Sequence, residues 1–228
     1  MHRSGQNSLH RTERIVIERN VLEDNSRTAM YNRGFCTAKQ WLSLNMVSSP
    51  GSGKTTILEN TVVRLREKHA LLVIEGDQQT DNDARRIART GAEAIQLNTG
   101  NGCHLNASMI RPLLEKSNLP PQSIILIENV GNLVCPALFD LGESERIVVL
   151  SITEGDDKPL KYPYIFADAD VCLINKIDLS PYVPCDINAM KDNMLHINPD
   201  IRIFETSALL GTGMDAWCDY LLSTVQKL

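Results

Sequence analysis

The sequence Ser48-Ser49-Pro50-Gly51-Ser52-Gly53-Lys54-Thr55 joins an apolar run, residues 42–48, to a stretch of helical character, residues 54–67. Its small residues let backbone N–H groups approach an anion closely, and the N-terminus of a helix adds a favourable dipole. In this pattern Lys54 reaches the β- and γ-phosphates of a nucleotide and Thr55 ligates Mg²⁺. The alternative is a Gly/Ser turn with a surface lysine. We predict a phosphate-binding loop formed by Pro50, Gly51, Ser52, Gly53, Lys54, Thr55 and Thr56.

Short apolar runs alternate with helical stretches along the chain around this loop. Such alternation predicts a mostly parallel sheet with helices on both faces, and near-continuous apolar runs are typical of strands that are covered on both sides. The expected fold class is therefore α/β, a doubly wound, mostly parallel sheet of P-loop NTPase architecture. The predicted strands are residues 42–48, 71–75, 94–97, 124–129, 147–153, 171–175 and 201–206, and the predicted helices are residues 54–67, 81–90, 105–116, 186–195 and 213–226.

The 228 residues suit one globular domain with a short appendage. Residues 1–12 are polar and predicted to be a disordered N-terminus. Residues 13–41 mix apolar and charged residues in a loosely helical pattern, which predicts an N-terminal helical arm. No clear linker divides residues 42–228, so we expect a single P-loop domain that also carries any metal site.

Charge and composition exclude several classes of protein. The net charge is −5 and the chain has no dense basic run, which argues against a nucleic-acid partner. No apolar stretch reaches about 18 residues, so no membrane span is expected. The first five residues lack the apolar core of a signal peptide. We therefore expect a cytoplasmic protein whose six cysteines are reduced.

A base-specificity loop is indicated by Asn175-Lys176-Ile177-Asp178, which follows an apolar run at the carboxyl end of a predicted strand. The Asp178 carboxylate can accept hydrogen bonds from both N1–H and the exocyclic amino group of guanine. Adenine lacks this pair of donors, and such a mismatch can discriminate by ~10⁴-fold. Asn175 is expected to support the base and Lys176 to cover its plane. Ser207 and Ala208, after the last strand, resemble a further guanine-contacting loop, although an ordinary strand-end turn is the alternative.

Two acidic residues at strand ends are candidates for holding Mg²⁺. Glu128 begins the sequence Glu128-Asn129-Val130-Gly131, in which the Gly131 N–H is placed to contact the γ-phosphate. Asp77 ends another strand and is an equally good candidate. With Lys54 and Thr55, these two carboxylates form the expected catalytic set. No residue stands out as the group that orients the attacking water, so slow hydrolysis is predicted.

A candidate transition-metal site consists of Cys103, His104 and, thirty-two residues later, Cys135. Two thiolates and an imidazole suit Zn²⁺ or Ni²⁺. Three ligands from one chain leave a position open for water or for a second chain. By spacing alone, an adjacent Cys-His pair is more often accidental.

These motifs together resemble the hydrogenase-maturation nickel-insertion GTPases, the HypB family, over roughly residues 18–228. The family carries Ser at the place of Ser48, where the general phosphate-loop motif has glycine. Its metal site uses a Cys-His pair and a later Cys, which fall on Cys103, His104 and Cys135. The most specific stretches are residues 44–56, 75–84, 98–105 and 127–136.

The resemblance implies a GTPase whose cycle gates nickel insertion into the large-subunit precursor of a [NiFe]-hydrogenase. It implies GTP or GDP, Mg²⁺ and Ni²⁺ or Zn²⁺ as ligands, and a homodimer that depends on nucleotide. The implied partners are a small nickel-binding accessory protein, HypA-like, and the hydrogenase precursor. The N-terminus carries neither the cysteine-rich nor the histidine-rich motif of some members, only His2 and His10, which argues against high-affinity nickel storage there.

Three alternatives remain open. The first is a nucleotide-regulated metal carrier without useful turnover. The second is a urease-type maturation GTPase, although the Cys-Pro-His motif of those proteins is absent. The third is an ATP-dependent small-molecule kinase, against which the sequence Asn175-Lys176-Ile177-Asp178 argues.

Overall fold

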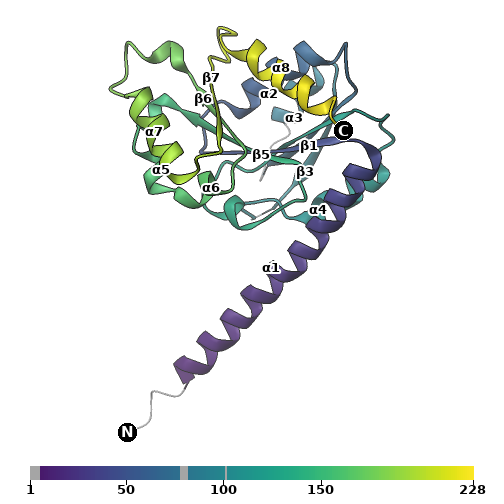
Figure 1. Cartoon of the computed structure of the whole chain (residues 1–228). Helices are drawn as coiled ribbons and strands as arrows, with labels where there is room; N and C mark the ends of the chain where they lie inside the picture. The colour runs from purple at the N-terminus through teal and green to yellow at the C-terminus, as the bar shows by residue number, and fades with distance from the viewer. Residues whose placement is uncertain (1–5, 78–81, 101) are drawn as a thin grey trace.

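The computed structural model describes residues 6–77, 82–100 and 102–228, with the side chains from residue 20 onward except those of residues 77 and 82–84. Its centre is a seven-stranded sheet in the order β3-β2-β4-β1-β5-β6-β7, and every pairing is parallel (Figure 1). The predicted α/β class and parallel sheet are confirmed. The strands are β1 Leu42–Ser48, β2 Leu71–Asp77, β3 Glu93–Asn98, β4 Ile124–Glu128, β5 Glu145–Ser151, β6 Val171–Asn175 and β7 Arg202–Glu205.

Helices cover both faces of the sheet, as the apolar strands require. One face packs against α2, α3 and α8, where Leu44 of β1 lies in one core with Leu58 and Trp217. The other face is covered by α1 and α4 on one half and by α6 and α7 on the other. The helices are α1 Gln6–Lys39, α2 Lys54–Leu65, α3 Asn82–Ala88, α4 Ala107–Lys116, α5 Lys158–Lys161, α6 Pro163–Ala167, α7 Ile187–Ile197 and α8 Met214–Val225.

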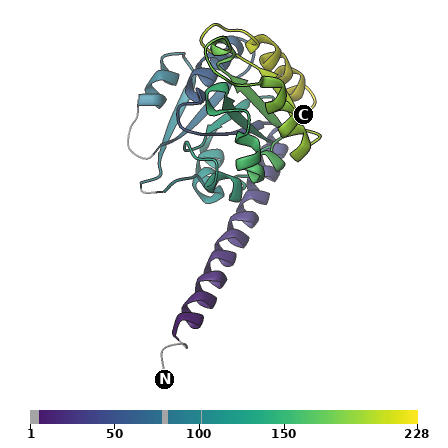
Figure 2. The same ribbon diagram turned by 90° about the vertical axis from the view of Figure 1, so that its left-hand side faces the viewer.

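The N-terminal helix α1 leaves the domain as a long projection (Figures 1 and 2). Its last turns are anchored because Ala29, Asn32 and Cys36 are buried, the last of them in one core with α4. The helix begins at Gln6, so residues 6–12 are helical where the sequence predicted disorder. Neither Pro nor Gly interrupts residues 6–33, which permits this extension. Over the described ranges, none of the helices has both the length and the apolar composition that a membrane span requires.

Some predicted boundaries are wrong for local reasons. The predicted strand at residues 147–153 is β5, which spans Glu145–Ser151 and runs into a 3-10 helix, η2 Ile152–Glu154. Ser151 and Glu154 form a reciprocal capping box there, which satisfies backbone N–H groups that would otherwise continue the strand. Two further 3-10 helices, η1 Cys135–Leu138 and η3 Ile177–Leu179, lie in the loops that follow β4 and β6.

The parallel arrangement brings four strand ends to one edge. The carboxyl ends of β1, β2, β4 and β6 lie on the same side of the sheet, which is where α/β proteins bind ligands. The phosphate loop follows β1, Glu128 ends β4 and Asn175 ends β6. Segments far apart in sequence therefore meet at one site.

Candidate nucleotide and metal site

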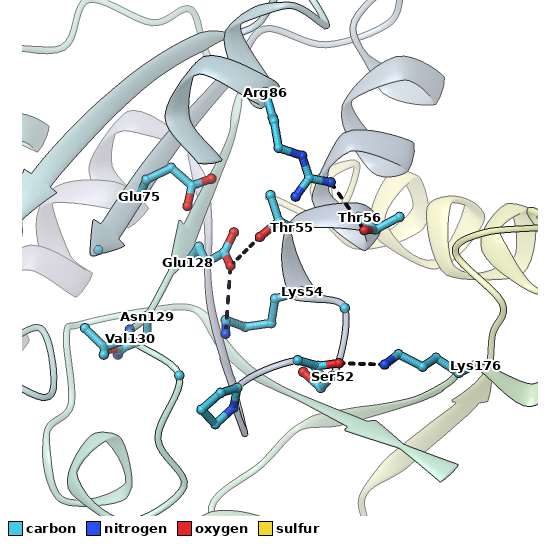
Figure 3. Close-up of a pocket in the computed structure, with 15 residues that line it drawn as sticks. Ser52, Lys54, Thr55, Thr56, Glu75, Arg86, Glu128, Asn129, Val130 and Lys176 are labelled. Atoms are coloured by element: carbon cyan, nitrogen blue, oxygen red, sulfur yellow. Dashed lines mark hydrogen bonds and ion pairs between the residues drawn. The ribbon is translucent and has the colours of Figure 1, made fainter. Parts of the chain in front are cut away.

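A cavity of about 490 Å³ opens at this edge of the sheet (Figure 3). The whole predicted phosphate loop, from Pro50 to Thr56, lines this cavity. Glu128, Gly131 and Lys176 line it too. The cavity is polar and lies at the N-terminus of α2, as an anion site requires. Its lining is Pro50, Gly51, Ser52, Gly53, Lys54, Thr55, Thr56, Glu75, Gly76, Arg86, Glu128, Asn129, Val130, Gly131 and Lys176.

The loop backbone depends on glycine at one position in particular. Gly53 has φ +98°, and a Cβ there would lie 2.4 Å from Nδ2 of Asn175. Both the left-handed backbone and the close approach exclude other residues. Gly131 approaches from the opposite side, where a Cβ would lie 3.2 Å from Cα of Pro50. The phosphate loop is thus held between the loop after β6 and the loop after β4.

Lys54 and Thr55 are held by groups inside the cavity. The Lys54 Nζ donates to Oγ of Ser48 at 2.8 Å and lies 3.8 Å from Oε1 of Glu128. The Thr55 hydroxyl donates to the same Glu128 oxygen at 2.9 Å. All three side chains of this Lys54–Thr55–Glu128 cluster are at least nine-tenths buried. Ser48 therefore has a role that glycine would not supply.

The donor set at this end of the cavity fits Mg²⁺. Glu75 of β2 is paired in register with Glu128 of β4, and both side chains are buried. Mg²⁺ prefers hard oxygen ligands, and the Thr55 hydroxyl lies beside the Glu128 carboxylate. Two buried carboxylates on neighbouring strands favour a cation between them. The side chain of Asp77, the other predicted ligand, lies outside the described residues, although its backbone ends β2.

Two residues that line the cavity, Glu75 and Arg86, were not among the predicted site residues. Arg86 reaches the cavity from α3, where it forms an ion pair with Glu59 at 2.7 Å and lies 3.4 Å from the Thr56 hydroxyl. No motif marks either residue. For Glu75, the available signal was its position near a strand end, two residues before Asp77.

The predicted base loop is tied directly to the phosphate loop. Asn175 Nδ2 donates to the Ser52 carbonyl at 2.9 Å, and Lys176 Nζ donates to the Gly51 carbonyl at 2.6 Å. Lys176 has a left-handed backbone, with φ +63°. These contacts fix the position of the base loop relative to the phosphate loop.

Asp178 lies next to the last strand-end loop. The Ser207 hydroxyl donates to Oδ1 of Asp178 at 2.5 Å, and the Ala208 N–H donates to Oδ1 of Asn175 at 3.0 Å. The structure thus brings Asn175, Asp178, Ser207 and Ala208 together. Ser207 positions the Asp178 carboxylate. The Ala208 N–H already donates to the Asn175 side chain.

The three candidate transition-metal ligands come together in the structure. Sγ of Cys103 lies 2.9 Å from Sγ of Cys135 and 3.7 Å from Nδ1 of His104. One ligand atom from each residue falls within a set no more than 4.8 Å across. A metal about 2.3 Å from sulfur and 2.0 Å from nitrogen separates adjacent ligand atoms by about 3.3–3.8 Å. The sulfur–nitrogen distance already fits, and the sulfur atoms need to separate by less than about 1 Å.

The surroundings of these ligands also suit a metal. Contact with Cys103, together with burial, holds the pKa of the Cys135 thiol above its ordinary value, so a metal that binds there must displace a proton. Burial lowers the pKa of His104, which favours the neutral imidazole that ligates metals. The His104 ring stacks on Phe139 with centroids 3.9 Å apart, which restrains its plane. All three ligands are partly exposed, so an ion or a partner can reach them.

A family comparison agrees with this geometry. Residues 43–205 match the model described as "CobW/HypB/UreG, nucleotide-binding domain". The matched range contains the phosphate loop, the Cys-His segment and the base loop.

Individual relatives are also similar over most of the chain. The hydrogenase maturation factor HypB of Escherichia coli (strain K12) is 53% identical over 207 residues, 91% of this chain and 71% of that protein. The crystal structure of the hydrogenase maturation factor HypB from Archaeoglobus fulgidus has a TM-score of 0.83 at 39% identity, covering 89% of this chain and 99% of that one. The structure of HypB from Helicobacter pylori in complex with nickel has a TM-score of 0.81 at 38% identity, covering 90% of this chain and 96% of that one.

Proposed function

Since this chain belongs to the HypB branch of the CobW/HypB/UreG family, we propose that it is a GTPase that gates nickel insertion into the large-subunit precursor of a [NiFe]-hydrogenase. One observation carries the proposal. The segment that lines the phosphate cavity, Glu128–Gly131, runs within four residues into Cys135 of the thiol and imidazole cluster. A nucleotide site and a soft metal site thus share one short loop.

The phosphate end binds the triphosphate through residues that already face the cavity. Lys54 exchanges Ser48 and Glu128 for the β- and γ-phosphate oxygens, and the backbone N–H groups of the phosphate loop surround the anion. Thr55 and Glu128, with Asp77 as predicted from the sequence, would hold Mg²⁺, which would supply positive charge that offsets the phosphates. Gly131 meets the γ-phosphate from the opposite side of the loop.

The base end selects guanine. Asp178 accepts hydrogen bonds from N1–H and the amino group of the base, and Ser207 holds the carboxylate in place. Asn175 supports this loop, and the Lys176 stem covers the base plane while its ammonium stays on the phosphate loop. An adenine would leave the Asp178 carboxylate without donors, which is the basis of the selection.

Hydrolysis is slow in this proposal. Water attacks the γ-phosphorus and the bond to the β–γ bridging oxygen breaks, which leaves GDP and phosphate. Among the described lining residues, the carboxylates Glu75 and Glu128 lie at the proposed Mg²⁺ end, and no Gln or His faces the cavity to orient water. Positioning and charge therefore supply the catalysis, and turnover lacks the contribution of a positioned base.

Nickel is the cargo, and Cys103, His104 and Cys135 hold it. The three ligands leave a position for water or for a ligand from a second chain of a homodimer that forms around nucleotide. The partners are a small nickel-binding accessory protein and the hydrogenase precursor. Similarity to the nickel complex from Helicobacter pylori supports nickel over zinc. Free thiols at Cys103 and Cys135 suit the reducing cytoplasm.

The test is steady-state hydrolysis of GTP and of ATP by the full chain, with bound nickel measured in parallel. We expect multiple turnovers of GTP, no comparable turnover of ATP and one nickel ion per Cys103–His104–Cys135 set. Nickel binding without GTP turnover would indicate a nucleotide-regulated carrier. Preference for ATP would contradict the assignment of the base loop.

A further inference from the structure

The side chain of Asn129 joins the phosphate cavity to the loop that carries Cys103 and His104, called the metal loop below. Asn129 directly follows β4 and is 1% exposed. Its Oδ1 accepts from the N–H of Val130 at 3.0 Å, on the cavity side, and from the N–H of Leu105 at 3.1 Å. Leu105 directly follows His104. One carbonyl oxygen therefore binds the backbone of both loops.

The other end of this carboxamide faces the central strand. Nδ2 of Asn129 donates to Oδ1 of Asn45 at 3.2 Å, and Nδ2 of Asn45 donates to Oε1 of Glu143 at 3.0 Å. The two backbone N–H donors at one end and the carboxylate at the other fix the orientation of both amides. This Asn129–Asn45–Glu143 chain is buried along its length and cannot exchange its partners for water.

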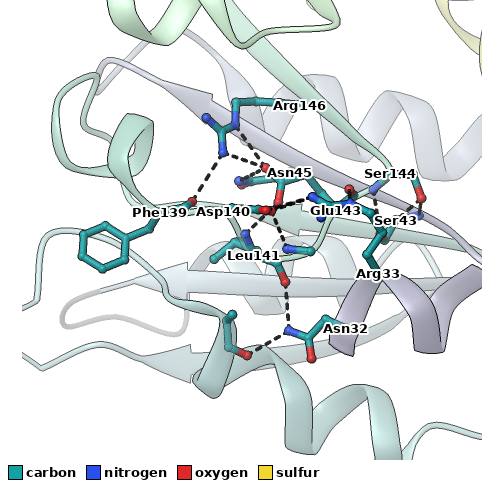
Figure 4. A network of polar contacts seen from close by, with 12 residues as sticks. Asn32, Arg33, Ser43, Asn45, Phe139, Asp140, Leu141, Glu143, Ser144 and Arg146 are labelled. Carbon is teal, nitrogen blue, oxygen red and sulfur yellow. Dashed lines mark hydrogen bonds and ion pairs between the residues drawn. The ribbon is translucent and has the colours of Figure 1, made fainter. Parts of the chain in front are cut away.

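From Asn45 the network continues through Glu143 to Leu141, Arg146 and Phe139 (Figure 4). Glu143 accepts from the Leu141 N–H at 2.7 Å and from Nε of Arg146 at 3.0 Å, and Arg146 in turn lies 3.5 Å from the Phe139 carbonyl. The ring of Phe139 stacks on His104. Asn129 is thus connected to His104 through Leu105 on one side and through the segment that carries Phe139 on the other.

Packing adds a third contact between the two loops. Leu105 is fully buried against Gly76, where an added Cβ would lie 2.7 Å from Cδ1 of Leu105. Gly76 itself lines the phosphate cavity. The residue after His104 therefore touches the cavity wall on β2 and is hydrogen-bonded to Asn129 beyond β4. A displacement of either wall moves the backbone next to a metal ligand.

We propose that Asn129 is the positioning residue that couples the nucleotide state to metal affinity. The proposal rests on the GTP-gated function above and assigns that gating to one side chain. A γ-phosphate that draws Gly131 and Val130 inward pulls on Oδ1 of Asn129, which the Leu105 N–H shares. The backbone beside His104 then shifts relative to Cys135, which changes the arrangement of the three candidate ligands. Metal affinity changes as a result, because Ni²⁺ and Zn²⁺ each prefer a particular coordination geometry.

A buried asparagine can also be purely structural, so the test needs a matched control. Asn198, which is partly buried, matches Asn129 in its hydrogen bonds, because its Nδ2 donates to the carbonyls of Phe166 and Ala169 at 3.0 and 2.8 Å. Its Oδ1 accepts from the Asp200 N–H. These contacts lie in the α6–α7 layer, on neither the cavity nor the metal loop. Asn198→Ala removes a comparable set of bonds from a different part of the fold.

The experiment is calorimetric titration of nickel into the GDP form and into the form with a non-hydrolysable GTP analogue. For the wild type we expect the two affinities to differ roughly 5–150-fold. In Asn129→Ala the ratio falls below about twofold, which is under the usual range of coupling, while each nucleotide still binds. In Asn198→Ala the ratio stays at the wild-type value.

Hydrogen exchange at the Leu105 amide gives a second readout that needs no metal. Its protection changes between the GDP and GTP-analogue forms of the wild type and of Asn198→Ala, but not in Asn129→Ala. If Asn129→Ala does not fold, Asn129→Leu takes its place. Leucine has nearly the branched shape of asparagine and so leaves no cavity, but it has no oxygen to accept from the Val130 and Leu105 N–H groups, so we expect the same fall of the ratio below about twofold.

The outcomes separate the two proposals. If wild-type nickel affinity is the same in the GDP and GTP-analogue forms, GTP gating is overturned, and the role of Asn129 with it. A wild-type ratio that persists in Asn129→Ala, or in the fallback Asn129→Leu, overturns only the role of Asn129. A ratio that is lost equally in Asn198→Ala assigns the loss to general destabilisation and likewise overturns the role of Asn129.

Discussion

The two ends of the nucleotide site are built differently. At the base end, Asn175 and Lys176 donate to backbone carbonyls of the phosphate loop, at Ser52 and Gly51. A nucleotide need not replace these bonds. At the phosphate end, Lys54 and Thr55 contact Glu128, and Lys54 also contacts Ser48. That cluster consists of contacts between the side chains that the proposed function assigns to phosphate and Mg²⁺.

The difference indicates where a conformational response can arise. In the proposed function, the bonds from Asn175 and Lys176 to the phosphate-loop backbone hold the base end fixed for one base. The side chain contacts at the phosphate end would exchange when the ligand changes, so the nucleotide state would be sensed there. The phosphate end also contains Glu128–Gly131, the segment that continues to Cys135. In this proposal, base recognition and the response to the γ-phosphate lie in different loops.

The largest expected effect is at the phosphate end. Lys54→Ala removes the cation that faces the β- and γ-phosphates, and we expect turnover of GTP to fall by at least about 10³-fold. Steady-state phosphate release measures it, and thermal unfolding checks that the protein stays folded. Retained turnover in a folded Lys54→Ala protein would remove this loop from the mechanism.

At the base end, Asp178→Asn should weaken GTP binding by about 2–4 kcal/mol, because an amide cannot accept from both guanine donors. Hydrolysis at saturating GTP should change far less than in Lys54→Ala. Competition of GTP, ATP and xanthosine triphosphate for binding measures the effect. A GTP affinity within twofold of the wild type means that the base loop is misassigned.

Removal of a thiol ligand should affect the metal and spare the nucleotide. Cys103→Ala and Cys135→Ala should each lower nickel affinity by more than about 10–100-fold, the range for groups that merely support a ligand. GDP affinity should not change. The thiols must lose their protons to bind, so wild-type nickel affinity should rise with pH. Nickel stoichiometry measured on the double variant tests the site, and an unchanged value contradicts it.

The smallest effect is expected at Arg86. This side chain faces the cavity but is held by Glu59, so its charge acts on the phosphates from a distance. Arg86→Gln should lower turnover of GTP by about tenfold, less than the loss of a direct phosphate contact. Arg85→Gln, on the exposed side of the same helix, is the control. Equal rates for the two variants would show that Arg86 does not contribute.

The sequence predicted the fold through features that depend on local pattern. Near-continuous apolar runs marked all seven strands, and β1 and β6 match their predicted ranges. The phosphate and base loops could be predicted because each is a contiguous motif in which the spacing itself determines the geometry. Residues 6–12 were misassigned because polar composition alone does not distinguish a solvated helix from a disordered segment.

The missing parts of the site depend on tertiary pairing. Glu75 is placed opposite Glu128 only by the register of β2 with β4, and Arg86 reaches the cavity only through the position of α3. The role proposed for Asn129 depends on its hydrogen bond to Leu105, which lies twenty-four residues earlier in the chain. No local spacing rule brings these residues together. Their proximity can be recognised only once the order of the strands in the sheet is known.

The most direct test of gated delivery is a reciprocal titration of the wild type. Nickel is titrated into the GDP and GTP-analogue forms, and each nucleotide is then titrated into metal-free and nickel-loaded protein. We expect nickel affinity to change roughly 5–150-fold with nucleotide state, and nucleotide affinity to change by the same factor with nickel, since coupling free energy is reciprocal. Equal nickel affinity in the two nucleotide forms would contradict the account and leave a GTPase and a metal site that do not communicate.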